Sequence, residues 1–140
     1  MGTRRKSREI AIQILYTLEI NETDIEDALT TFCDMYRPDG NFLDFAKHLL
    51  HGVFQHQKEI DHIIRKISAH WSLNRIALVD RSIIRTAIYE LLYCPDIPAK
   101  VTIDEAVEIA KKYSTAKSSA FINGILDKVA HQFSDKKSAT

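Results

Sequence analysis

Several residue types are scarce in this sequence, and each shortage excludes a class of protein. The only two cysteines, Cys33 and Cys94, are far apart in the chain, which is too few for a disulfide framework or a paired-cysteine zinc site. Three prolines and four glycines leave little material for a loop-rich β fold. No apolar run approaches the roughly 18 residues of a membrane span, and the N-terminus has no apolar segment of secretory type. These shortages favour a helical protein of the cytoplasm.

Length and composition predict one folded domain. The chain has 140 residues, of which 45% are hydrophobic and 27% charged, and this composition excludes bulk disorder. A chain of this length buries roughly two thirds of its unfolded surface around a single core. We therefore expect one domain over residues 1–140, with flexible ends at about 1–4 and 134–140.

The zero net charge hides an uneven distribution. Four basic residues and no acidic residue lie in the first eight positions, and residues 18–45 hold eight acidic residues against Arg37 alone. One interpretation is a solvated basic tail beside a solvated acidic face. The other is a small polyanion-binding site with a repulsive neighbour. The four basic residues are Arg4, Arg5, Lys6 and Arg8.

Apolar residues recur every three or four positions through most of the chain, which predicts helices. Two patterns typical of capping boxes, Thr23-x-x-Glu26 and Thr102-x-x-Glu105, predict helix starts. Residues 99–103, at the second of these patterns, could instead form a short extended connector. We expect about six or seven helices in an all-α bundle. The predicted segments are 5–20, a helix from Thr23, 42–67 as one helix or two broken near Gln57, a connection at 69–74, 76–92, a helix from Thr102, a polar loop at 114–119, and a last helix through 121–129.

Patterns typical of catalysis are missing. The sequence has no glycine-rich phosphate loop, no nucleophile elbow and no HExxH. His48 and His51 lie one helical turn apart, but solvated or core-edge histidines explain them better than a metal site. We therefore expect no catalytic residue, no metal and no cofactor.

The remaining candidates are cations and aromatic rings, which together hold single-stranded nucleic acid. Tyr16 and Phe121 could stack on bases, although Phe121 also fits a helix stripe facing the core and Tyr16 is also explained as a half-buried helix tyrosine. Lys111, Lys112 and Lys117 flank the predicted polar loop.

Four segments of the chain follow one another in this order: RRKSREIAIQILYTLE, IALVDRSIIRTAIYELLY, IPAKVTIDEAVEIAKKY and FINGILDK. Together, these segments make the chain resemble the NusB family of bacterial transcription antitermination factors. The resemblance covers nearly the whole chain. The last two segments are the most specific. NusB-like domains are sometimes fused to an RNA methyltransferase domain, and we expect no such domain here, because the sequence ends shortly after the last of these segments.

The resemblance implies a helical fold of two small subdomains that binds boxA-type single-stranded RNA in nascent ribosomal RNA transcripts together with ribosomal protein NusE. This pair then joins NusA, NusG and RNA polymerase. The family's arginine-rich motif falls on Arg4, Arg5, Lys6 and Arg8, which matches the site that charge alone indicates. The family's aromatic residue near RNA and NusE falls on Phe121.

Two further positions follow from the resemblance. An acidic residue that meets NusE in the family falls on Asp80. The family loop before Phe121 often carries an acidic pair and a lysine, whereas this chain has Ala116, Lys117 and Ala120. This difference changes the local charge at the expected RNA and partner contacts.

We therefore predict a non-enzymatic RNA-binding adaptor with RNA contacts at the basic cluster, Tyr16, Lys112, Lys117 and Phe121, and partner contacts at Asp80 and Phe121. A second interpretation is a helical protein-interaction module, such as a homodimer whose basic face is masked by its own acidic segment. A third is an RNA-modifying enzyme, which would bind S-adenosylmethionine.

Overall fold

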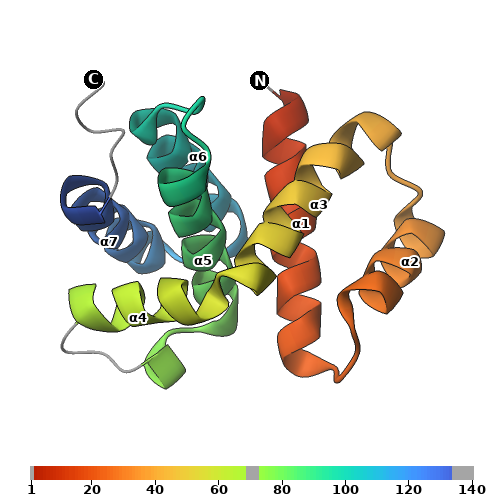
Figure 1. The fold of residues 1–140 in the computed structure, drawn as a ribbon, viewed down its shortest axis with the longest axis horizontal. Coiled ribbons are helices and arrows are strands. Elements are labelled where there is room, and N and C mark those ends of the chain that lie inside the picture. The colour runs from red at the N-terminus through yellow and green to blue at the C-terminus, as the bar shows by residue number, and fades with distance from the viewer. Residues whose placement is uncertain (1, 69–72, 134–140) are drawn as a thin grey trace.

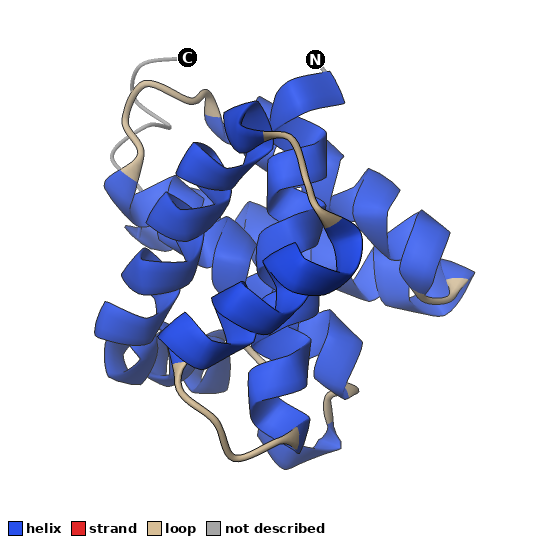
Figure 2. Cartoon of the chain, turned by 90° about the vertical axis from the view of Figure 1, so that its right-hand side faces the viewer, coloured by secondary structure: helices blue, strands red, loops and turns tan. Residues whose placement is uncertain are grey.

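The computed structural model describes residues 2–68 and 73–133, which form helices and short connections without a strand (Figure 2). This architecture confirms the all-α prediction. The predictions for residue 1, for the connection at 69–72 and for the tail at 134–140 lie outside the described residues. The helices are α1 (Gly2–Ile20), α2 (Ile25–Tyr36), α3 (Gly40–Gln55), α4 (Gln57–Ile67), the 3-10 helix η1 (Leu73–Arg75), α5 (Leu78–Tyr93), α6 (Ala99–Tyr113) and α7 (Ala116–Phe133).

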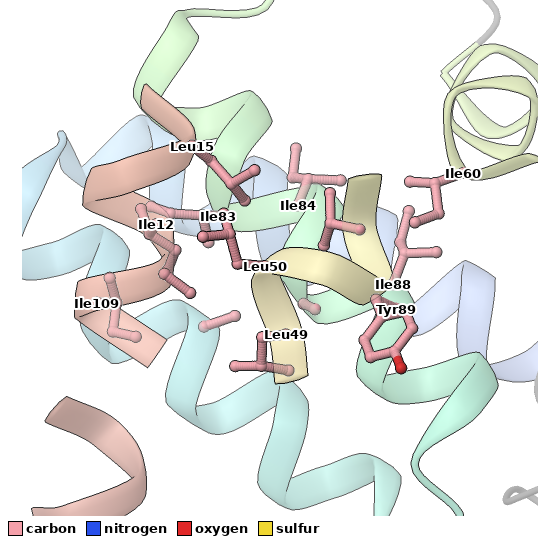
Figure 3. Packing of buried hydrophobic residues seen from close by; sticks show 14 of the residues in the cluster. Ile12, Leu15, Leu49, Leu50, Ile60, Ile83, Ile84, Ile88, Tyr89 and Ile109 are labelled. Atoms are coloured by element: carbon pink, nitrogen blue, oxygen red, sulfur yellow. The ribbon is translucent and has the colours of Figure 1, made fainter. Parts of the chain in front are cut away.

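Helices α1 and α5 lie in the middle of the molecule. In Figure 1, α3 crosses α1 and α2 lies beside these two helices, while α4, α6 and α7 surround α5. Buried residues of α1, α3 and α5 belong to one hydrophobic cluster, which includes Leu15, Leu50 and Ile83 (Figure 3). The two groups of helices therefore share a continuous core. None of the helices in the described part of the chain is long and apolar enough to span a membrane.

Helix α5 is buried on nearly all sides, including its polar residues. The buried guanidinium of Arg85 donates to Asp61, with Nε to Oδ1 at 2.8 Å, and also pairs with Glu19. Such partners are needed because an isolated buried charge is costly. Within the described residues, every buried side-chain nitrogen or oxygen has a hydrogen-bond partner.

Several helix starts differ from the predictions. Helix α2 is capped by Asp24, whose carboxylate accepts from the Asp27 amide at 2.8 Å, so Thr23 is not the cap. Helix α6 begins at Ala99, which excludes the extended connector and places Thr102 inside the helix. Helix α7 begins at Ala116, which shortens the predicted polar loop.

Other boundaries lie within a few positions of the predicted ones. The segment 42–67 is indeed two helices, and they are separated at His56, next to the predicted break. Helix α1 begins at Gly2, earlier than the predicted start near residue 5. The connection between α2 and α3 begins with Arg37, which has φ 43° and ends α2 in the left-handed conformation.

Candidate nucleic-acid interface

Arg8 lies inside the protein. Its guanidinium donates to both carboxylate oxygens of Glu90, at 2.7 and 2.9 Å, and the two side chains are only 5% and 1% exposed. The Thr102 hydroxyl donates to the same carboxylate at 3.0 Å. Arg8 therefore ties α1 to α5 and, through the shared carboxylate, to α6. Direct contact between Arg8 and RNA would require this buried pair to open.

Arg5 is paired but remains partly open to solvent. Its Nε and Nη2 donate to the two carboxylate oxygens of Glu105 in α6, at 2.7 and 2.8 Å. The Arg5 side chain is 42% exposed. The hydrogen bond from Arg5 lowers the pKa of the Glu105 carboxyl, and the same bond raises the pKa of the guanidinium. Both groups are therefore charged near neutral pH.

Arg4 and Lys6 carry the most accessible charges of the cluster. The Arg4 guanidinium lies over the ring of Phe45 in α3, 4.4 Å from its centroid, and Arg4 Nη1 is 3.8 Å from Asp96 in the turn before α6. Lys6 is exposed and forms no ion pair with a described residue. The surface at the start of α1 thus presents Arg4, Lys6 and the open part of Arg5.

The electrostatics of this helix end favour an anion. The first turn of α1 contains no acidic residue, so the positive end of the helix dipole and the cations act in the same direction. Backbone amides at a helix start are also ready donors to phosphate oxygens. The arrangement can hold a phosphate-bearing strand.

Tyr16 lies away from this cluster, in a groove between α1 and the start of α5. Tyr16 lies ten positions after Lys6 in α1, a rise of about 15 Å along the helix. The groove has a volume of about 660 Å³ and a largely apolar lining. Its lining residues are Glu9, Ile12, Gln13, Tyr16, Ala77, Leu78, Val79 and Tyr113.

Lys112 lies at the edge of this groove. Its Nζ is 3.3 Å from Glu9 Oε2, and the Tyr113 hydroxyl donates to Oε1 of the same glutamate at 3.2 Å. The neighbouring Tyr113 and Glu9 raise the pKa of the Lys112 ammonium. The structure therefore places Lys112 beside Glu9, which lines the groove.

Asp80 is buried at the start of α5, with 5% exposure. Its carboxylate accepts from the hydroxyls of Ser114 and Ser118 at 2.8 and 2.7 Å. These two residues flank the start of α7, so Asp80 holds the connection between α6 and α7 in place. Its acidic group is not open at the surface.

The start of α7 presents a different set of side chains. Ala116, Lys117 and Ala120 are exposed, whereas Phe121 is partly buried and packs against the hydrophobic core. The Thr115 hydroxyl accepts from the Ser118 amide at 3.0 Å and caps this helix. The three positions that differ from the family pattern therefore lie on the surface, in the first turns of α7.

Four residues of the site were not predicted from the sequence. Arg8 pairs with Glu90, which also accepts from Thr102, and Arg5 pairs with Glu105. The Arg4 guanidinium packs on the ring of Phe45. The pattern Thr102-x-x-Glu105 was interpreted as a capping box, but both side chains point to α1 or α5. An acidic residue near a basic cluster gives no sequence signal when the two are about a hundred positions apart.

The comparisons with known proteins agree over nearly the whole chain. The transcription antitermination protein NusB of Geobacter sulfurreducens is 46% identical, over 97% of this chain and 99% of the relative. The structure of Thermotoga maritima NusB superposes with a TM-score of 0.88 at 39% identity, over 97% and 96% of the two chains. A crystal structure of antitermination factors NusB and NusE in complex with dsRNA has the same fold, with a TM-score of 0.85 at 24% identity over 95% and 99% of the two chains.

The curated relative is a transcription antitermination protein, and the solved structure is a NusB protein with the same helical fold. A model of the NusB family matches residues 5–131. The chain belongs to the NusB family.

Proposed function

We propose that the chain binds boxA-type single-stranded RNA of nascent ribosomal RNA transcripts through the exposed cations at the start of α1. The observation that carries this proposal is the open placement of Arg4, Lys6 and part of Arg5 at a helix end without acidic residues. Arg8 has a supporting role in this proposal, because its pair with Glu90 fixes α1 against α5. Such a transcript-binding protein acts in the cytoplasm.

Two further surfaces extend this proposal. Lys117 and Phe121 at the start of α7 form a second RNA contact, where the exposed lysine attracts phosphates. The groove containing Tyr16 receives ribosomal protein NusE, because its apolar lining includes the first residues of α5, next to Asp80. Asp80 then affects NusE binding indirectly, because it fixes the connection between α6 and α7 through Ser114 and Ser118. The RNA and NusE together link the chain to NusA, NusG and RNA polymerase.

Arg4→Ala with Lys6→Ala tests the RNA site. We expect weaker binding to a boxA-like RNA in a fluorescence anisotropy titration, measured with and without NusE. Loss of two phosphate contacts should reduce the slope of log affinity against log salt by about 1.4, at about 0.7 per contact to a single strand.

The matched control is Arg65→Ala with Lys66→Ala, which removes the same charge from the last turn of α4, far from the start of α1 (Figure 1). A scrambled RNA measures sequence preference. Equal affinities and salt slopes for the two double variants would reject the start of α1 as the RNA site.

A further inference from the structure

Arg5 has one free edge in addition to the edge that Glu105 occupies. A guanidinium carries five N–H donors in a planar fork. Glu105 accepts from Nε and from one hydrogen of Nη2. The two hydrogens of Nη1 and the second hydrogen of Nη2 have no acceptor among the described residues. This remaining fork has the geometry that binds phosphate oxygens in pairs.

Arg8 forms the same kind of bidentate pair with a carboxylate, but in the core, where a ligand cannot reach it. Its Nε and Nη2 also donate to a carboxylate, that of Glu90, and its Nη1 is 3.8 Å from Glu105. Because the Arg8 side chain is 5% exposed and that of Arg5 is 42% exposed, only Arg5 offers its free edge to a ligand. Glu105 thus stands between one buried and one open arginine.

We propose that Glu105 is a positioning residue, which holds the Arg5 guanidinium so that its free edge receives an RNA phosphate. This inference rests on the proposed RNA-binding function. A free arginine loses side-chain freedom when it binds, and that loss weakens binding. In this protein the pair with Glu105 orders the guanidinium before RNA arrives. The depressed pKa of Glu105 agrees with a pair that remains charged at neutral pH.

The Glu105 charge also has an opposite effect, since a carboxylate repels phosphate. The two effects predict opposite results when the charge is removed. If positioning dominates, Glu105→Gln weakens RNA binding although it makes the surface more positive. If repulsion or competition for Arg5 dominates, the same variant binds RNA more tightly.

The test is an anisotropy titration of the full chain with a boxA-like RNA. We expect Glu105→Gln to bind about three- to tenfold more weakly, the range that corresponds to ordering one long side chain. The matched control is Glu108→Gln, which removes the same charge one turn later in α6, from an exposed residue paired with Lys111. This control should bind as tightly as the unmodified chain or more tightly.

Combined variants distinguish positioning from a general effect on the fold. In an Arg5→Ala background, Glu105→Gln should cause no further loss, because the side chain that it orients is absent. Urea unfolding of each variant shows whether the fold is retained. If Glu105→Gln does not fold, Arg5→Lys replaces it in the titration. This variant keeps the charge without the fork, and we expect the same three- to tenfold loss.

The outcomes separate the two proposals. Binding by Glu105→Gln at least as tight as that of the unmodified chain, or an equal loss in the Arg5→Ala background, overturns the role of Glu105 alone. Unweakened binding by Arg5→Lys overturns it in the same way. Failure of the unmodified chain to bind the RNA overturns the proposed function, and the role of Glu105 with it.

Discussion

Adjacent cations at the start of α1 have different physical roles. Lys6 is exposed, whereas the Arg8 guanidinium is enclosed with Glu90. The sequence gives both residues the same charge and similar length, so composition alone assigns them to one site. Their separation depends on the direction that each side chain takes from the helix, because residues two positions apart lie on different faces.

Arg8→Ala should therefore reduce stability more than it reduces RNA contact. The variant leaves the Glu90 carboxylate buried without its main donor, and breaking a buried ion pair costs about 3–5 kcal/mol. Urea unfolding monitored by circular dichroism measures this loss in the free energy of unfolding.

Lys6→Ala is the control at the neighbouring position. A change at this exposed residue should alter the free energy of unfolding by less than about 0.5 kcal/mol. An Arg8→Ala variant that is as stable as Lys6→Ala, yet weaker in RNA binding, would place Arg8 in direct contact with RNA.

At the scale of helices, the contact between α3 and α5 depends on one glycine. A Cβ atom added at Gly52 would overlap the ring of Tyr89, with Cε2 only 2.6 Å away. Tyr89 cannot easily move, because its ring also packs against His48 and Tyr93, with centroids 5.6 and 5.3 Å away. Gly52 thus permits the backbone of α3 to approach an aromatic ring of α5.

Gly52→Ala should destabilise the protein by about 1–3 kcal/mol, the usual cost of overpacking a core. The opposite sign is expected for Gly124→Ala in α7, where nothing lies within 4 Å of the added Cβ. An alanine in an open helix position gains about 0.5–1 kcal/mol over glycine. Thermal unfolding of both variants measures whether each substitution lowers or raises stability. A stabilising Gly52→Ala would contradict this packing.

Helix positions were predictable from the sequence to a greater extent than helix starts. The apolar period located the central helix and the break near His56 because it reflects which residues face the core. The start of α6 was missed, since Thr102 and Glu105 fit a capping pattern equally well. Their use as partners of α1 and α5 depends on tertiary contacts, which a local pattern does not contain.

At the scale of the whole molecule, the basic cluster was predicted and its supporting carboxylates were not. Charge sign locates Arg4 to Arg8 directly in the sequence. Glu90 and Glu105 become part of the site only because α5 and α6 pack against α1, which brings together residues 82 and 100 positions apart. The site is therefore a property of the assembled helices, and its geometry depends on the integrity of the shared core.

The shared core also predicts how the molecule unfolds. Because α1 and α5 contribute to one hydrophobic cluster, the two groups of helices should unfold together, as expected for a single domain of this size.

Leu126→Ala removes a fully buried side chain of α7, at a cost of about 2–5 kcal/mol. The slowest-exchanging backbone amides of α1 and α3, far from the substitution, should lose as much protection in hydrogen exchange as those of α5 and α7. Lys128→Ala, at an exposed position of α7, should leave protection unchanged. Loss of protection confined to α4, α5, α6 and α7 would instead mean that this group of helices can open alone, and that α1 keeps its shape when it does.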